Sequence, residues 1–214
     1  MKLKIVMPEN PTRRVARLIL LVVGIVGVGI YCEAWLYRTA YQIYESWQFD
    51  HASAERTPPP THKPVTLPAV LPDPDRGVPK SSVSGIGGVV GRISIPRLNI
   101  SAIVEEGVDE TTLSRAVGHI PGTALPGESG NIGIAGHRDT FFKKLKDLQP
   151  HDHIDFTTHS GRYHYTVESL TVVDPSDVSV LESKGQKILT IVTCFPFHYI
   201  GNAPRRFIVH AVAE

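Results

Sequence analysis

The sequence predicts a mostly β domain with a closed or sandwich-like sheet, preceded by one N-terminal transmembrane helix. Residues 86–214 contain short apolar runs that are rich in β-branched and aromatic residues and are separated by turn residues. An uncharged run occupies residues 18–32, and a proline-rich stretch separates it from the β segment. A chain of 214 residues has room for one domain and an additional segment.

The uncharged run reads LILLVVGIVGVGIYC and continues through residues 33–37 as EAWLY. A helix of about twenty residues can cross a hydrocarbon core of ~30 Å, so a signal anchor is expected over 18–37. The positive charges that precede it predict a cytoplasmic basic N-terminus over residues 1–17 and an extracytoplasmic remainder. These charges are Lys2, Lys4, Arg13, Arg14 and Arg17.

Two alternatives to the anchor remain open. A cleaved signal peptide also has a basic start and a short apolar stretch, but no clear small-x-small cleavage site follows the run. A buried helix of a soluble protein would need apolar neighbours on every side. The anchor is therefore the favoured interpretation, and it predicts a single-pass membrane protein.

Residues 38–85 are expected to form a juxtamembrane segment and a tether rich in proline and serine. Aromatic residues over 38–49 favour a short amphipathic helix on the outer membrane surface. Prolines then recur from residue 58 to residue 79, which favours a semi-extended tether. A long ordered loop is the alternative, but such loops are uncommon in compact domains.

The predicted catalytic domain, 86–214, contains seven apolar runs with the length and composition of strands. They cover residues 89–95, 100–106, 131–136, 153–158, 162–173, 187–194 and 206–213. Short helices are expected at TTLSRAV (111–117) and FFKKLKDL (141–148). No segment repeats at a fixed period, which excludes a solenoid or propeller.

Three reactive side chains lie at the ends of predicted strands. Cys194 ends one run, His137 directly follows another, and Arg206 begins the last one. If Cys32 lies in the membrane, Cys194 is an unpaired thiol in an exported domain, which is unusual. Rigid strand ends can direct such side chains into a single pocket.

These residue types suit attack on a peptide carbonyl. A thiol has a reference pKa of ~8.5 and attacks as the thiolate, so it needs a neighbouring imidazole to accept or supply the proton. An arginine offers permanently charged donors to the oxygen on which negative charge develops. Cys194 is therefore the candidate nucleophile, His137 the acid/base group and Arg206 the anion stabiliser.

Two stretches carry a family resemblance: GHIPGTALPGESGNIGIAGHRDTFF and LTIVTCFPFHYIGNAPRRFIV. They resemble the signature regions of sortases, particularly class D and the Gram-negative forms. The family's Thr-Leu-x-Thr-Cys motif corresponds to Thr190–Cys194, with isoleucine in place of leucine. The family's histidine follows Ala-Gly, as His137 does, and its arginine begins the last strand, as Arg206 does.

The resemblance implies a closed eight-stranded β-barrel with short helices. It also implies cleavage of a C-terminal sorting signal similar to Leu-Pro-x-Thr-Gly through a thioacyl intermediate on Cys194. The acceptor would be an amine, either on a peptidoglycan precursor or on a protein lysine. Neither cofactor nor metal is expected, since the acidic residues form no recognisable calcium loop. A net charge of +1 without a basic stripe gives no indication of nucleic-acid binding.

Some residues and functions compete with these assignments. Arg205 is the alternative to Arg206, and His119 is the alternative to His137. Asp139 is expected to have a structural role, whereas Thr193 is as consistent with shaping the pocket or contacting substrate as with simple packing in the strand. His151 and His153 have metal-ligand spacing, but an exposed turn explains them more simply. The competing functions are a membrane-anchored barrel that binds without turnover and an unrelated exported cysteine transpeptidase acting on peptidoglycan.

Overall fold

The structure, a computed structural model, describes residues 11–54, 88–183, 185–199 and 201–214. By its internal contacts, the chain divides into two compact units, the first ending at Tyr41 and the second covering Gln42–Glu214. The first ten residues and most of the expected tether lie outside the described residues. The domain boundaries inferred from the sequence therefore stay predictions.

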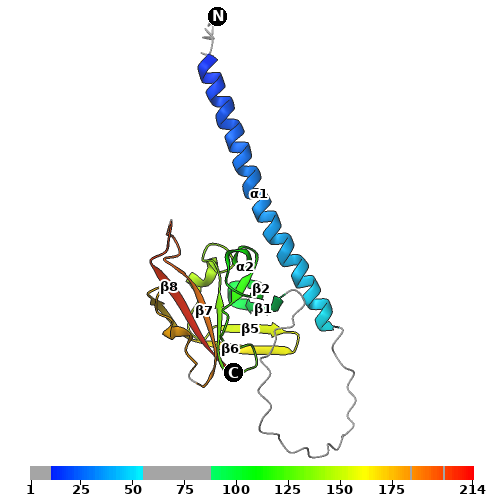
Figure 1. Ribbon diagram of the computed structural model, residues 1–214, viewed down its shortest axis with the longest axis vertical. Helices are drawn as coiled ribbons and strands as arrows, with labels where there is room; N and C mark the ends of the chain where they lie inside the picture. Colours follow the sequence, from blue (N-terminus) through cyan, green and yellow to red (C-terminus); the bar gives the residue numbers. More distant parts are fainter. Residues whose placement is uncertain (1–10, 55–87, 184, 200) are drawn as a thin grey trace, which may run out of the picture. The chain divides into compact units, whose positions relative to one another are not determined.

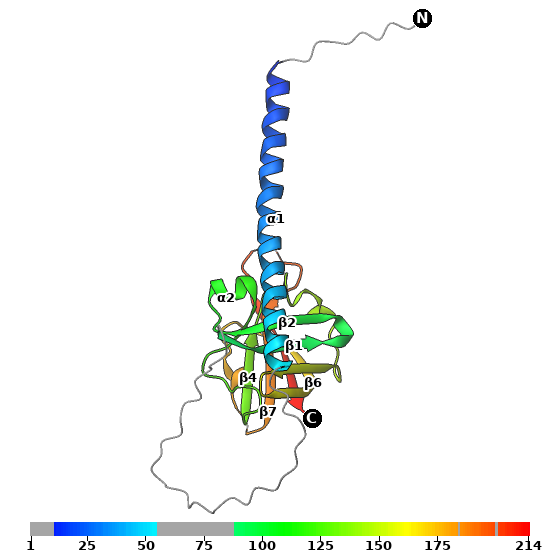
Figure 2. The same ribbon diagram turned by 90° about the vertical axis from the view of Figure 1, so that its right-hand side faces the viewer.

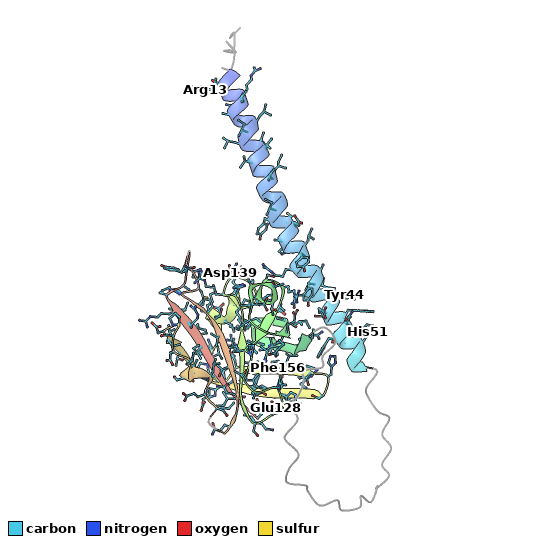
Figure 3. The ribbon with its side chains drawn as sticks, in the orientation of Figure 1. Arg13, Tyr44, His51, Glu128, Asp139 and Phe156 are labelled. Atoms are coloured by element: carbon cyan, nitrogen blue, oxygen red, sulfur yellow. The ribbon has the colours of Figure 1, made fainter. Side chains whose placement is uncertain are left out.

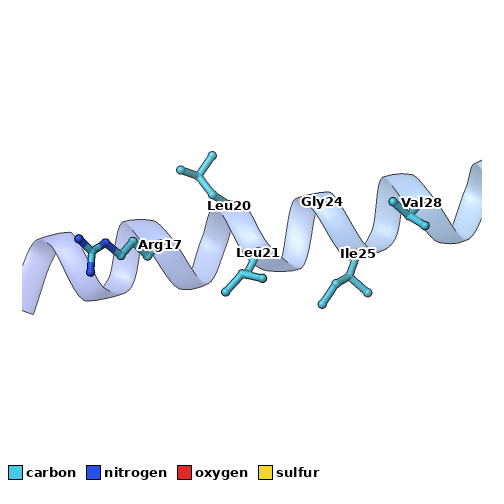
Figure 4. A pocket seen from close by; sticks show the side chains of 6 residues that line it. All are labelled: Arg17, Leu20, Leu21, Gly24, Ile25 and Val28. Carbon is cyan, nitrogen blue, oxygen red and sulfur yellow. The ribbon is translucent and has the colours of Figure 1, made fainter.

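Helix α1 covers Pro11–Ala54 and begins the described chain (Figure 1). Within it, Thr12–His51 is long and apolar enough to cross a membrane, with a mean hydropathy of 2.4 over its most apolar window. None of that window is buried by protein. Figure 4 shows six residues of this helix, Arg17 to Val28, lining a hollow on its surface. An exposed apolar helix of this length fits a single-pass membrane anchor.

Eight strands form a closed barrel, which confirms the predicted fold class (Figures 1 and 2). The order around the barrel is β1-β2-β3-β4-β7-β8-β6-β5, and only the β2–β3 and β4–β7 pairs are parallel. The strands are β1 (Val89–Ile95), β2 (Ile100–Glu106), β3 (Val117–His119), β4 (Gly130–Ala135), β5 (His153–Thr158), β6 (Gly161–Val173), β7 (Lys187–Phe195) and β8 (Arg205–Ala213).

Four short helices connect the strands. Helix α2 (Glu110–Arg115) begins at Asp109, whose carboxylate accepts a hydrogen bond from the Thr112 amide at 3.1 Å, a typical N-cap contact. The other three are 3₁₀ turns: η2 (Pro96–Leu98), η3 (Lys143–Asp147) and η4 (Ser179–Leu181). The helices expected over 111–117 and 141–148 thus correspond to α2 and η3, both shorter than expected.

Strand alternation separates an apolar interior from an outer face. Side chains such as Ile134, Leu189, Ile191 and Val209 are fully buried in the barrel interior. Phe156 of β5, labelled in Figure 3, is also completely buried. Successive residues of a strand point to opposite faces, so the neighbours of these residues lie on the outside. Two of the candidate catalytic residues, Cys194 and Arg206, lie on the outer face of β7 and β8.

The last part of α1 is bonded to the barrel by a glutamine. Gln42 accepts a hydrogen bond from the Ile103 amide at 3.0 Å and donates one to the Arg115 carbonyl oxygen at 2.7 Å. The Gln42 side-chain amide therefore pairs with a backbone N–H of β2 and a backbone C=O of α2. Ile103 itself is completely buried, so its amide has little access to water.

Phe49 and Arg92 form a second contact between α1 and the barrel. Phe49, one of the aromatic residues of the expected juxtamembrane helix, is buried in a cluster with Val89 and Ile103. The Arg92 guanidinium lies 5.3 Å from the Phe49 ring centroid and donates 2.9 Å hydrogen bonds to Asp50 and to the Ser46 carbonyl. The helical segment from Gln42 onward thus belongs to the barrel unit.

Replacing Gln42 with alanine is expected to lower the free energy of unfolding of the barrel by about 1–3 kcal/mol, because the Ile103 amide loses its partner. Urea denaturation of the full chain in detergent measures the change. Gln48→Ala is the matched control, since Gln48 donates a hydrogen bond to the Tyr44 hydroxyl at the surface. Equal stability of the two variants would contradict the bridging role.

An ion pair fixes the turn that precedes β5. Arg97 of η2 binds Asp152 through both carboxylate oxygens, and its Nη2 also donates to the Asp147 carbonyl at 2.6 Å. Asp152 is buried, and its carboxylate also accepts from the Gln149 amide at 2.8 Å. The hydrogen bond from Arg97 is the main cause that lowers the pKa of Asp152 below its usual value.

Because this pKa is lower in the folded state than in the unfolded chain, the pair stabilises the fold above the unfolded-state pKa of ~3.9. That stabilisation is lost as the pH falls through the folded pKa. Asp152→Asn is therefore expected to lower stability at pH 7 and to reduce the steepness of acid unfolding below about pH 4. Urea midpoints measured from pH 2.5 to 7 check this. A variant whose midpoint falls with pH as steeply as that of the wild type would contradict the prediction.

Candidate active site

The structure brings the ends of three strands together at one end of the barrel. Cys194 of β7 and Arg206 of β8 are directly paired across the antiparallel ladder, so both side chains lie on the same face of the sheet. His137 follows β4 two residues after Ala135, which is paired with Val192 in the parallel β4–β7 ladder. All three candidate side chains are half-buried.

The backbone before His137 is fixed to strand β7. The Gly136 amide donates to the Val192 carbonyl at 3.2 Å, and the Gly136 carbonyl accepts from the Thr193 hydroxyl at 2.7 Å. Thr193 is buried, so this hydrogen bond lies away from water. The threonine before the candidate nucleophile is therefore hydrogen-bonded to the residue before the candidate base.

Gly136 leaves no room for a side chain, because a Cβ there would lie 2.7 Å from a ring carbon of buried Phe142. Gly136→Ala is therefore expected to displace His137 and to lower kcat/KM of the cysteine-dependent reaction predicted from the sequence by about 10²-fold, as misplacement by ~1 Å does in other enzymes. Steady-state assays, together with a thermal midpoint that shows a folded protein, check the result. Near-wild-type turnover would mean that Phe142 moves instead.

The two adjacent arginines lie on opposite faces of β8, as successive residues of a strand do. Arg205 is exposed and paired with Phe195, whereas Arg206 is half-buried and paired with Cys194. The Nη1 group of Arg206 donates to the carbonyl oxygens of Ala203 and Arg205 at 3.2 and 3.1 Å. The guanidinium is thus held at the start of β8, on the same face as the thiol.

In the described part of the chain, no hydrogen bond joins the side chains of His137 and Cys194. Contacts of this kind are often long in a free enzyme and shorten when substrate binds. Both cysteines are free, so Cys194 is available as a thiol. Asp139, two residues after His137, is exposed, and Figure 3 labels it near the end of the barrel opposite Glu128.

Two connecting loops meet over the outer face of β4 at Gly133. A Cβ at this position would lie 3.0–3.1 Å from side-chain atoms of Ile120, Thr123 and Leu181. The first two residues belong to the β3–β4 loop, and Leu181 belongs to the β6–β7 connection. Gly133 and Ala135 lie on one face of β4, and His137 follows two residues later, so this apolar contact lies on the strand that leads to the candidate site.

A polar network that was not predicted from the sequence supports the β6–β7 connection. The Asn131 amide nitrogen donates to the Val180 carbonyl at 3.1 Å, and its oxygen accepts from the Thr190 hydroxyl at 2.7 Å. The Thr190 hydroxyl also lies 3.0 Å from Nδ1 of His210. These residues lie next to a polar cavity of about 440 Å³, which Glu168 also lines.

Two of the remaining candidate histidines, His119 and His153, have structural partners. His119 is buried, with Nδ1 2.7 Å from the Glu106 carboxylate and Nε2 3.0 Å from the Ala124 carbonyl oxygen. His151 lies in the turn before β5, and the imidazole of His153 contacts Glu214 at 2.8 Å on the surface. Across the described ranges, no group of three or more His, Cys, Asp or Glu side chains is arranged to hold a metal ion.

The fold and the site together define a class: closed β-barrel proteins with a cysteine, a histidine and an arginine at the ends of neighbouring strands. The sortase domain model matches residues 93–214, which is more than half of the chain. The chain therefore belongs to the sortase family. The resemblance inferred from the two signature stretches is confirmed.

Several named proteins are similar to this chain. Sortase D of Bacillus subtilis is 34% identical over 125 residues, covering 58% of this chain and 63% of that protein. Sortase A of Streptococcus agalactiae is 29% identical, covering 59% and 53%. The chain thus spans less than two thirds of the curated relatives that it matches.

Solved structures agree with the fold. A Clostridium perfringens protein described as a sortase D5 transpeptidase matches with 33% identity and a TM-score of 0.54, covering 59% of this chain and 79% of that one. Sortase C1 of Streptococcus agalactiae matches with 32% identity and a TM-score of 0.56, covering 60% and 68%.

Proposed function

We propose that this protein is a membrane-anchored cysteine transpeptidase that cleaves a sorting signal and transfers the acyl group to an amine. The observation that carries the proposal is the pairing of Cys194 with Arg206 beside the end of β4, which bears His137. A nucleophile, a proton carrier and a permanent cation are the three groups that acyl transfer through a thioester requires.

In the first half-reaction, the Cys194 thiolate attacks the carbonyl carbon of the scissile peptide bond. Arg206 donates to the oxygen that becomes negative, and this donation stabilises the tetrahedral intermediate. The carbon–nitrogen bond then breaks, and His137 supplies the proton that leaves with the amine. The product is a thioester between Cys194 and the N-terminal part of the substrate.

In the second half-reaction, an incoming amine replaces the departed one. His137, now without that proton, accepts a proton from the amine as it attacks the thioester carbonyl. The carbon–sulfur bond breaks, and the thiolate of Cys194 is restored. The proposed substrate is a protein with a C-terminal Leu-Pro-x-Thr-Gly-like signal. The proposed acceptor is a peptidoglycan precursor or a protein lysine, and no step requires a metal.

The apolar helix supports a location at a bacterial cell membrane, with the basic N-terminus in the cytoplasm and the barrel outside. Its exposed span fits one membrane crossing. Three of the arginines inferred to be cytoplasmic, Arg13, Arg14 and Arg17, lie in the first turns of α1, and Arg13 is labelled in Figure 3. The positive-inside rule gives this orientation.

Intact-mass analysis of the full chain in detergent tests the reaction. The protein is incubated with a panel of Leu-Pro-x-Thr-Gly peptides, with and without triglycine or acetyl-lysine amide as the amine. The expected result is an acyl adduct on Cys194 that converts to an amine-exchanged peptide, with neither product formed by Cys194→Ala. A folded, reduced protein that binds peptides but forms no adduct would favour an anchored binding module without turnover.

A further inference from the structure

The turn after His137 is bonded to the loop between β7 and β8 by the side chain of Arg138. Its Nη2 group donates to the carbonyl oxygens of Tyr199 and Gly201, at 2.6 and 3.2 Å. The guanidinium carbon also lies 5.9 Å from the centroid of the Tyr199 ring, at the limit of cation–π contact. One side chain therefore holds the loop at two backbone positions.

The location of this contact connects it to the site. The β7–β8 loop joins the strand that carries Cys194 to the strand that begins with Arg205 and Arg206. Arg138 is the immediate neighbour of His137. Its hydrogen bonds thus connect the backbone segments that carry all three candidate catalytic side chains.

The contact depends on the shape of arginine. A guanidinium is planar and directs several donors in fixed directions, whereas the ammonium group of lysine is a compact charge on a flexible stem. The Arg138 side chain contacts two carbonyl oxygens and an aromatic ring, which suits a planar guanidinium better than an ammonium group. The sequence alone gives no reason to separate Arg138 from an ordinary turn residue.

The same turn holds polar atoms in an unfavourable state. Nη1 of Arg138 and the hydroxyl of Thr140 are both buried and have no hydrogen-bond partner among the residues that the structure describes. Burying such atoms without partners costs free energy, and an apolar side chain would pack a turn without that cost.

We propose that Arg138 is a positioning residue that holds the β7–β8 loop beside Cys194 during acyl transfer. The proposal rests on the proposed transpeptidase function. Arg138 acts through Tyr199 and Gly201 and does not itself touch the reacting atoms. With the loop fixed, the thioester and the incoming amine meet in one geometry. With the loop free, water competes more effectively for the thioester.

The test compares Arg138→Lys and Arg138→Met with Arg162→Met, in the full chain in detergent. Arg162 is an exposed arginine on β6 and serves as the matched control. Hydrogen exchange of peptides from residues 196–204 is expected to be faster by about tenfold in both Arg138 variants, because a local opening becomes easier. Exchange in the Arg162 variant is expected to match that of the wild type.

Kinetics provide the functional readout. Both Arg138 variants are expected to lower kcat for amine transfer by about tenfold or more while hydrolysis of the same peptide falls less, since orientation of the amine is lost. The rate at which iodoacetamide alkylates Cys194, followed from pH 5 to 9, is expected to stay at the wild-type value. That unchanged profile would show that the thiol and His137 are intact.

Two outcomes overturn the proposal. Loop exchange that is alike in all four proteins would show that Arg138 does not hold the loop, whatever the activity. A changed alkylation profile in Arg138→Lys would place the defect in the thiol itself. Failure of the wild type to form an acyl adduct would instead refute the proposed function, and the exchange data would still decide whether Arg138 fixes the loop.

Discussion

Replacing His137 with alanine is expected to lower kcat/KM for amine transfer by about 10²–10⁴-fold, the usual contribution of a positioned acid/base group. His137 is the histidine that follows Gly136, which is bonded to β7 on both its amide and its carbonyl sides. The imidazole is therefore carried by backbone that cannot shift independently of Cys194. Steady-state kinetics with a captured peptide and excess amine measure the effect.

His119→Gln is the matched control for this loss. His119 is buried, and its partners are Glu106 and the β3–β4 loop, so its loss is expected to change stability more than chemistry. With folded fractions matched by circular dichroism, kcat/KM is expected to stay within about fivefold of the wild type, since no proton transfer is removed. A large loss in this variant together with a mild loss in His137→Ala would reverse the assignment.

The fold class could be predicted because most strands are long enough to show a pattern. The run that became β7 is apolar and rich in β-branched residues, so composition and length both indicated a strand. Strand β3 was missed because it contains only Val117, Gly118 and His119. Its position depends on parallel pairing with Val104–Glu106, a long-range contact that no local pattern carries.

The residues of the candidate site, like the strands, could be predicted from the sequence only in part. His137, Cys194 and Arg206 could be selected because their residue types carry the chemistry and because they adjoin strand ends. Gln42 and Arg138 could not be selected, because a polar residue in a predicted helix or turn is expected to be solvent-exposed unless its partners are known. Their partners lie 61 and 73 residues away for Gln42, and 61 and 63 for Arg138.

Arg206→Met is expected to reduce kcat for acyl transfer by about 10²–10³-fold, the loss seen when one oxyanion donor is removed. The reason is the register, because Arg206 lies directly across the ladder from Cys194 on the same face. Arg206→Lys retains the charge but not the planar group. It is therefore expected to recover only a small part of the loss.

Arg205→Met provides the contrast, since it removes the same charge one residue away. Adjacent strand residues point to opposite faces, and Arg205 is paired with Phe195 and exposed. The kcat of Arg205→Met is expected to stay within about threefold of the wild type, as for the loss of a surface charge outside the site. Pre-steady-state measurement of adduct formation separates the two variants, because the oxyanion forms in that step.

Equal losses would mean that net charge near the thiol matters and position does not. A larger loss for Arg205 would require the last strand to be shifted by one residue, which moves every side chain of β8 to the other face.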